Sequence, residues 1–227
     1  MSSNSTTTKS QIEKKRKSES ENTNNDEEEE NAEDGSSMKM SYVWAMPNKN
    51  TFLIPPINRL IKKYLDASPP DAVWIDPFAN ESCFNDRMKY TNDINPAFKT
   101  THHLDALAFL RLQPDNSVDG VLFDPPYTIH QINQVYAGFG DEKPVKQSTA
   151  YYSEISRICK PNACVISFGF TACGVPSTLS RDVKLRKLAG KTKRQTQFKK
   201  CEMLVLGHGG GHNATIVVVD KRITEEL

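Results

Sequence analysis

Residues Val118 to Tyr127 read VDGVLFDPPY and contain the clearest strand pattern of the chain. Its first six residues are almost continuously apolar, as in a strand that is buried on both faces of a parallel sheet. The strand is expected to end before Asp124, because two prolines follow and proline has no N–H to donate to a sheet. An acidic residue therefore stands at the carboxyl end of a central strand.

The segments on both sides of this strand alternate between helix and strand patterns. Helical spacing of apolar residues is seen in 55–65, 104–110 and 148–159, and strand patterns cover 72–75, 89–92 and 163–168. Two further β-rich runs, 201–206 and 215–219, flank the glycine-rich sequence GHGGGHN, which is typical of an antiparallel hairpin. The alternation predicts an α/β fold with a mostly parallel sheet that ends in a hairpin.

Composition divides the 227 residues into two parts. Residues 1–40 are rich in Ser, Asn, Glu and Lys, contain no aromatic residue and show no apolar period, which predicts a disordered tail. Residues 41–227 have the composition of one globular domain and carry a mild excess of basic residues. That excess suits a polyanionic partner, but many enzymes of small molecules carry as much.

Features that direct a chain to a compartment are sparse. No signal peptide or membrane-spanning run is present, and the five cysteines form no CxxC pair, so an intracellular protein without a membrane partner is expected. The block Lys14 to Lys17, KKRK, has the composition of a nuclear import signal and equally that of a solvated charge run. We expect a nuclear location if the host is eukaryotic.

Three acidic residues each follow a separate predicted strand. Asp76, Asp93 and Asp124 would share one rim of the sheet, because ligands of open parallel sheets bind outside the carboxyl ends of the strands. A cofactor that carries ribose hydroxyls and an ammonium group, such as S-adenosylmethionine, needs acids in such positions. No metal-ligand spacing accompanies them, and we expect no metal.

The sequence Asp124-Pro125-Pro126-Tyr127 is the most specific chemical signal in the chain. An exocyclic amino group on an aromatic base is a poor nucleophile, because its lone pair is delocalised into the ring. A carboxylate and a backbone carbonyl that accept both amino hydrogens would free the lone pair, and Asp124 with the Pro125 carbonyl suits these roles. Tyr127 would offer a ring on which the base stacks.

This motif resembles that of the amino-methyltransferases of DNA and RNA, whose catalytic sequence is (D/N/S)PP(Y/F/W). The resemblance extends from Val43 to Asp220 and is nearest to the short phage and bacterial adenine-specific DNA methyltransferases. The stretches that carry it include WAMPNKNTF, IDPFAN, TNDINP, VDGVLFDPPYT, VISFG and HGGGHN. It implies a class I methyltransferase fold, Rossmann-like, with a seven-stranded sheet, S-adenosylmethionine as cofactor and DNA, in preference to RNA, as substrate.

The resemblance also implies roles for individual residues. Those of the cofactor site are Thr51 and Phe52 at the methionine end, Asp76, Pro77, Phe78 and Ala79 in the loop after the first strand, Asp93 with Ile94 at the ribose, and Asp105 with Ala106 at the adenine. Asp124 to Tyr127 would form the catalytic motif. The family's cofactor loop usually reads DPFxGSG, whereas this chain has DPFANES without either glycine. Asn80 tolerates a left-handed backbone better than most residues and could replace the first.

Several alternatives stay open. A glycine-poor loop leaves room for a catalytically silent nucleic-acid-binding partner, and the same motif serves cytosine N4 or adenine in RNA. Because no separate recognition domain is present, target recognition could come from a protein partner or a dimer. The basic stretch Arg181 to Lys200 favours contact with a phosphate backbone over a plain solvated helix. His208 and His212 favour a hairpin tip over a metal site, and Tyr42 and Trp44 are expected in the core or beside the cofactor.

Overall fold

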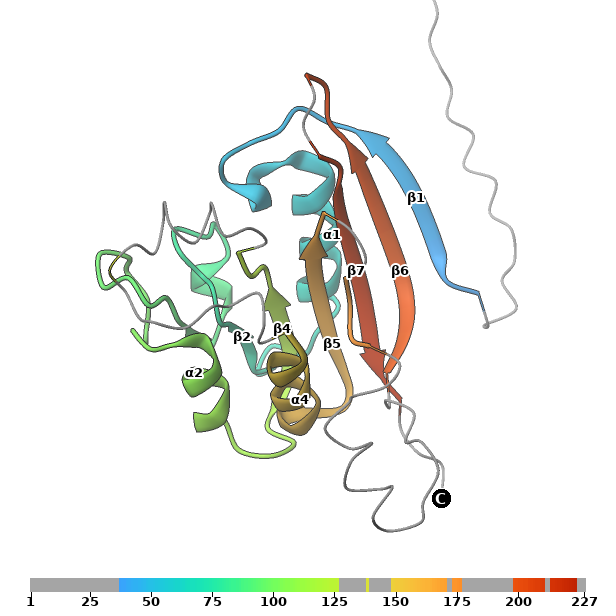
Figure 1. Ribbon diagram of the computed structural model, residues 1–227. Coiled ribbons are helices and arrows are strands. Elements are labelled where there is room, and N and C mark those ends of the chain that lie inside the picture. Colours follow the sequence, from blue (N-terminus) through green and yellow to red (C-terminus); the bar gives the residue numbers. More distant parts are fainter. Residues whose placement is uncertain are drawn as a thin grey trace, which may run out of the picture. The chain divides into compact units, whose positions relative to one another are not determined.

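Seven strands form one sheet in the order β1-β6-β7-β5-β4-β2-β3 in the computed structural model (Figure 1). It describes residues 37–126, 138, 148–170, 173–176, 198–210 and 213–223. The strands are β1 (Lys39–Trp44), β2 (Trp74–Asp76), β3 (Tyr90–Thr91), β4 (Val118–Phe123), β5 (Cys159–Gly169), β6 (Phe198–Gly207) and β7 (Thr215–Arg222). Among these described strands β7 alone runs antiparallel to its neighbours. The predicted α/β, Rossmann-like sheet of seven mostly parallel strands is confirmed.

Helices cover both faces of this sheet (Figure 1). They are α1 (Pro55–Asp66), α2 (Ala106–Leu112) and α4 (Ser148–Ile158), with short 3-10 turns at Thr51–Leu53 and Asn85–Arg87. Alternate residues of β4 point to opposite faces, so Leu122 joins the core cluster that contains α1, whereas Val121 and Phe123 join the cluster that contains α2 and α4. β4 is therefore buried on both sides, as its continuous apolar run predicts.

The predicted elements are confirmed within a few residues of their ends. β4 has the predicted bounds, α1 extends the predicted helix by one residue, and the predicted hairpin is the pair β6 and β7. The hairpin does not close the sheet, however, because β1 pairs in parallel with the outer side of β6 and forms the edge. In β5 the pairing with β4 passes from Cys159 directly to Cys164, so the intervening residues bulge out and Asn162 takes a left-handed φ of 66°.

Strand β1 corrects two predictions. It begins at Lys39, inside the stretch 1–40 that was predicted as a tail, so the boundary at residue 41 is two residues late. Tyr42 and Trp44 are not core residues, because they remain 72% and 59% exposed, whereas Val43 and Ala45 on the other face of the strand pack on the core. The alternation was hard to recognise because the exposed set of side chains is larger and more apolar than the set that faces the core.

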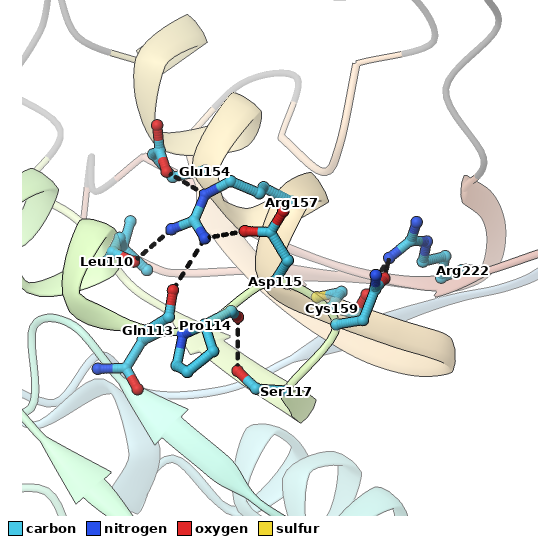
Figure 2. Close-up of polar contacts among 10 residues, drawn as sticks. Leu110, Gln113, Pro114, Asp115, Ser117, Glu154, Arg157, Cys159 and Arg222 are labelled. Carbon is cyan, nitrogen blue, oxygen red and sulfur yellow. Dashed lines mark hydrogen bonds and ion pairs between the residues drawn. The ribbon is translucent and has the colours of Figure 1, made fainter.

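A single arginine ties α4 to the end of α2 (Figure 2). The Arg157 guanidinium donates to the carbonyls of Leu110 and Gln113 at 3.1 and 2.9 Å, and it forms ion pairs with Glu154 and Asp115. Carbonyls in the last turn of a helix have no partner within the helix, so a buried end needs such donors. Arg157 thereby fixes the end of α2 against α4.

Other predictions fall outside the described residues. They concern the tail as far as residue 36, its basic block Lys14 to Lys17, Tyr127, His212 and the basic stretch 181–197. Among the helices that the structure describes, each is too short or too polar to cross a membrane.

Candidate active site

The carboxyl ends of three neighbouring parallel strands bring three acidic residues to one rim of the sheet. β2 ends at Asp76, β3 is followed by Asp93, and β4 is followed by Asp124. β2 lies between the other two strands and pairs in parallel with both. Asp76 is close enough to both of the other carboxylates for their charges to raise its pKa. The three acids that the sequence singled out therefore lie together.

Asp76 is the most unusual of the three, because its side chain is completely buried. Its Oδ1 accepts a hydrogen bond of 2.9 Å from the Phe78 amide. Within the described part of the chain, no donor reaches its Oδ2. Burial, together with the charges of Asp124 and Asp93, holds the pKa of Asp76 well above its ordinary value. A buried acid among acids is stabilised by a cation, which the ammonium and sulfonium groups of S-adenosylmethionine would bring.

The loop after β2 adopts the backbone conformation that glycine usually provides in the family, although this chain has no glycine there. Asn80 adopts a left-handed φ of 45°, as predicted for the position of the first family glycine. Ser82, which replaces the second glycine, has no positive φ, so a side chain there causes no backbone strain. The Asn80 carbonyl accepts from the Asn85 side chain at 3.1 Å, and the Ser82 amide donates to the Ala79 carbonyl at 2.9 Å. The loop is thus closed by its own hydrogen bonds.

A cluster of aromatic rings anchors this loop on the sheet. The ring of Phe78 packs edge-on against Phe123 of β4 and Tyr151 of α4, with centroid distances of 5.8 Å to each. Phe123 and Tyr151 also contact each other at 5.8 Å. Edge-to-face pairs of this kind stabilise by about 0.5–1.5 kcal/mol beyond the area that they bury. Phe78 thereby fixes the loop against the strand that carries Asp124.

Asn92 joins the three segments of the rim, and it was not among the predicted site residues. Its side-chain amide donates to the carbonyls of Pro77 and Leu104 at 3.1 and 3.0 Å, and its Oδ1 accepts from the Leu104 amide at 3.0 Å. Its backbone bonds to Asp76 and Ala79, each at 2.9 Å. The side chain is almost completely buried. Asn92 therefore holds the loop after β2 and the start of α2 at fixed positions around the acids.

We expect Asn92→Ala to lower the free energy of unfolding by about 2–3 kcal/mol. Three side-chain hydrogen bonds are lost, each worth about 0.5–1.5 kcal/mol, and their partners stay buried without replacements. Urea unfolding followed by fluorescence measures the change. Asn95→Ala is the matched control, because Asn95 makes one exposed side-chain hydrogen bond, to the Ala97 amide. If the two variants lose equal stability, Asn92 does not have this joining role.

An open pocket of about 180 Å³ is lined by one of the three acids, Asp124. Binding sites for drug-sized molecules usually measure about 300–1,000 Å³, so this pocket has room for one end of a nucleoside cofactor. Of the residues assigned from the resemblance, Thr51, Phe52, Phe78, Ala79, Asp124, Pro125 and Pro126 line it. Its other walls were not predicted and comprise Lys49, Asn50, Leu53, Asn80, Glu81, Ser82 and Cys83. The segment before α1 and the loop after β2 thus meet at the proline motif.

Six further residues assigned from the resemblance are described but do not line this pocket: Asp76, Pro77, Asp93, Ile94, Asp105 and Ala106. Asp105 caps α2, because its Oδ1 accepts from the amides of Leu107 and Ala108 at 2.9 and 3.2 Å. The next residue, Ala106, is buried in the core. Asp93 accepts from the Asn95 amide at 2.9 Å, and Ile94 is half-buried. A structural capping role therefore accounts for Asp105, whereas its place beside an adenine stays a prediction.

The proline motif directly follows β4. Its residues Asp124, Pro125 and Pro126 are half-buried, and Tyr127 lies outside the described residues. Asp124 has a second neighbour besides Asp76. Cys173, which follows β5, donates weakly to the Ile216 carbonyl at 3.4 Å. Burial first, and the nearby carboxylates of Asp220 and Asp124 in smaller part, raise the pKa of Cys173 to about 12. Its thiol is therefore protonated at neutral pH and adds no charge to the rim.

His208, at the tip of the β6–β7 hairpin, has a structural role. Its Nδ1 lies 2.8 Å from the Ala45 carbonyl, and its Nε2 lies 2.9 Å from the Thr215 hydroxyl. Because a carbonyl only accepts, Nδ1 carries a proton and donates to Ala45, and in the neutral ring Nε2 accepts from the Thr215 hydroxyl. Both ring nitrogens are thus engaged within the protein. Among the described residues no three side chains gather as metal ligands.

No protein-family model and no curated protein matches this chain. Similar solved structures include the Escherichia coli protein yhhF, with 11% identity and a TM-score of 0.45 over 80% of this chain and 92% of that one. TrmN from Thermus thermophilus has 15% identity and a TM-score of 0.45 over 75% and 49% of the two chains. A Burkholderia thailandensis 1,6-didemethyltoxoflavin-N1-methyltransferase, solved with S-adenosylhomocysteine, has 12% identity and a TM-score of 0.43 over 74% and 77%. The fold assignment itself follows from the strand order and pairing described above.

Proposed function

We propose that this chain is an S-adenosylmethionine-dependent methyltransferase that acts on an exocyclic amino group of a nucleic-acid base, with adenine N6 in DNA as the leading target. One observation carries the proposal. Asp124, Pro125 and Pro126 line the same pocket as the loop after β2, and beside that loop a buried acid, Asp76, has an oxygen without a described partner. A motif suited to an amino group thus adjoins a pocket suited to a cationic cofactor.

The residues of the rim have separate roles in cofactor binding and in methyl transfer. Asp76 and the loop after β2 would hold the cofactor, with Asp93 at its ribose, and S-adenosylmethionine would supply an electrophilic methyl group and leave as S-adenosylhomocysteine. Asp124 and the Pro125 carbonyl accept the two hydrogens of the target amino group, so its lone pair is freed for the new nitrogen–carbon bond. The extra proton on nitrogen then leaves to solvent, with Asp124 as its first acceptor. Tyr127 stacks on the base.

Methyl transfer from labelled S-adenosylmethionine to unmethylated DNA and to RNA tests the proposal directly. We expect label in DNA, and nucleoside analysis by mass spectrometry should identify N6-methyladenine. N4-methylcytosine, or label in RNA alone, would keep the reaction and correct the substrate. If neither polymer gains label in single- or double-stranded form, the proposed enzyme activity is wrong.

A second candidate function is a silent partner that keeps the fold and binds nucleic acid without transferring methyl groups. The specific observation in its favour is that Asn80 and Ser82 line the pocket at the two positions where the family has glycines, with Glu81 between them. Isothermal titration calorimetry with S-adenosylmethionine and S-adenosylhomocysteine separates the two functions. The enzyme binds both molecules, whereas the silent partner binds neither.

A further inference from the structure

Strand β1 presents an uncovered apolar stripe at the edge of the sheet. Met38, Met40, Tyr42, Trp44 and Met46 alternate along it, and their exposed fractions are 37%, 62%, 72%, 59% and 68%. Scattered apolar residues are normal on a protein surface, but five large ones in a continuous row mark an interaction site. Lys39 is the only charged residue between Met38 and Met46, so the usual protection of an edge strand by charge is weak.

The backbone of β1 has one side available for pairing. The Ala45 amide donates to the Gly207 carbonyl of β6 at 3.1 Å, so the odd-numbered residues of β1 direct their backbone groups toward β6. Successive residues of a strand point these groups in opposite directions. The N–H and C=O groups of Met40, Tyr42 and Trp44 therefore point away from the sheet. Because β1 is the last strand in the sheet order, no described strand pairs with them.

The stripe is also symmetric about Tyr42. Residues 38 and 46 are both methionine, and residues 40 and 44 are methionine and tryptophan. If two copies of β1 pair antiparallel about Tyr42, each Met40 lies opposite the partner's Trp44 and the two Tyr42 residues face each other. Sulfur–aromatic contacts of this kind are favourable. The same register lets the outward backbone groups of Met40, Tyr42 and Trp44 form hydrogen-bonded pairs.

We propose that β1 pairs with β1 of a second copy of this chain, in an antiparallel register centred on Tyr42. A self-complementary patch on a two-fold axis is the commonest way in which identical chains associate. Single-stranded nucleic acid is the other candidate for an exposed aromatic row. Three of the five residues are methionines, however, which lack a flat ring for base stacking, and none of the five is a cation that could bind phosphate. The proposal is independent of the reaction catalysed.

Cysteine cross-linking tests the register. In a Cys83→Ser background, which removes the exposed native thiol, Tyr42→Cys should form a covalent dimer under mild oxidation. In a hydrogen-bonded antiparallel pair the two Cα atoms lie about 5.5 Å apart, within the range that a disulfide spans. Met40→Cys and Trp44→Cys are the matched controls. Each should stay monomeric alone, because its copies lie about 13 Å apart along the strands, and an equal mixture of the two should cross-link.

Light scattering on the full chain tests the association itself. We expect the wild type to have twice the chain mass of 25.5 kDa and Tyr42→Lys to have the mass of one chain. Leu112→Lys, which replaces an exposed leucine at the end of α2, should leave the dimer intact. A monomeric wild type, or equal cross-linking of all three single cysteine variants, would overturn the proposal. A monomer that loses affinity for a DNA or RNA oligonucleotide on Tyr42→Lys substitution would assign the stripe to nucleic acid.

Discussion

Asp124→Ala should lower the rate of methyl transfer at least about 100-fold while the protein stays folded. A positioned acid–base group typically contributes about 10²–10⁴ to a rate, and alanine removes the acceptor for one amino hydrogen. The substitution should also stabilise the rim slightly, because the charge of Asp124 acts unfavourably on the buried Asp76. Initial rates with labelled cofactor, measured beside circular dichroism, separate lost chemistry from lost structure.

Asp124→Asn is the control for this variant. Its side-chain oxygen still accepts a hydrogen bond at the same place, so we expect an activity between those of wild type and Asp124→Ala. The loss in both variants should fall on kcat more than on KM for the nucleic acid, because the hydrogen bonds matter most when the lone pair is freed. An alanine variant with wild-type kcat would exclude Asp124 from the reaction.

Asp76→Asn should change stability and cofactor affinity in opposite directions. Asparagine keeps the acceptor for the Phe78 amide, removes a buried negative charge and adds an N–H that can donate to a neighbouring carboxylate. We expect the ligand-free protein to be stabilised by about 1 kcal/mol, which corresponds to roughly 2–4 °C in Tm. The affinity for S-adenosylmethionine should fall about 10- to 100-fold, because the charge that attracts the cofactor's cationic groups is lost.

The effect of Asp76 on the stability of the folded protein depends on pH. Burial raises the pKa of Asp76 in the folded protein, so the folded state binds this proton more tightly than the unfolded chain. The contribution of Asp76 to stability is therefore favourable at pH values below about 4 and is lost as pH rises through the folded pKa. Wild type and Asp76→Asn should have similar stability in acid and diverge toward neutral pH. Thermal melts between pH 4 and pH 8 measure the difference, and parallel curves would contradict the assignment.

The central part of the fold was predictable because its signals are local. Val118–Phe123 is apolar on both faces of the strand, and the acids that follow β2, β3 and β4 reach one rim through the geometry of parallel strands. Asn80 was predictable for a similar reason, since few residues besides glycine adopt its φ. Such features depend on residues within a few positions of one another.

Other features were not predictable because distant segments create them. The role of Asn92 depends on carbonyls that lie 12 and 15 residues away in the chain. β1 became a strand through pairing with β6, and its own residues show little contrast between polar and apolar faces. The capping bonds of Asp105 could be expected from an acid before a helix, but a resemblance to cofactor-binding sequences assigned that residue elsewhere.

The parallel pair of β1 and β6 also bears on the order in which the protein can assemble. Lys39–Trp44 pairs with Glu202–Gly207, which lies near the other end of the chain. The segment after β1 supplies Lys49 to Leu53, one wall of the pocket. During synthesis this wall cannot take its final support until β6 has left the ribosome, and such long loop closures are slow steps in folding. The pocket is therefore completed late, and a chain truncated before β6 lacks the strand that anchors this wall.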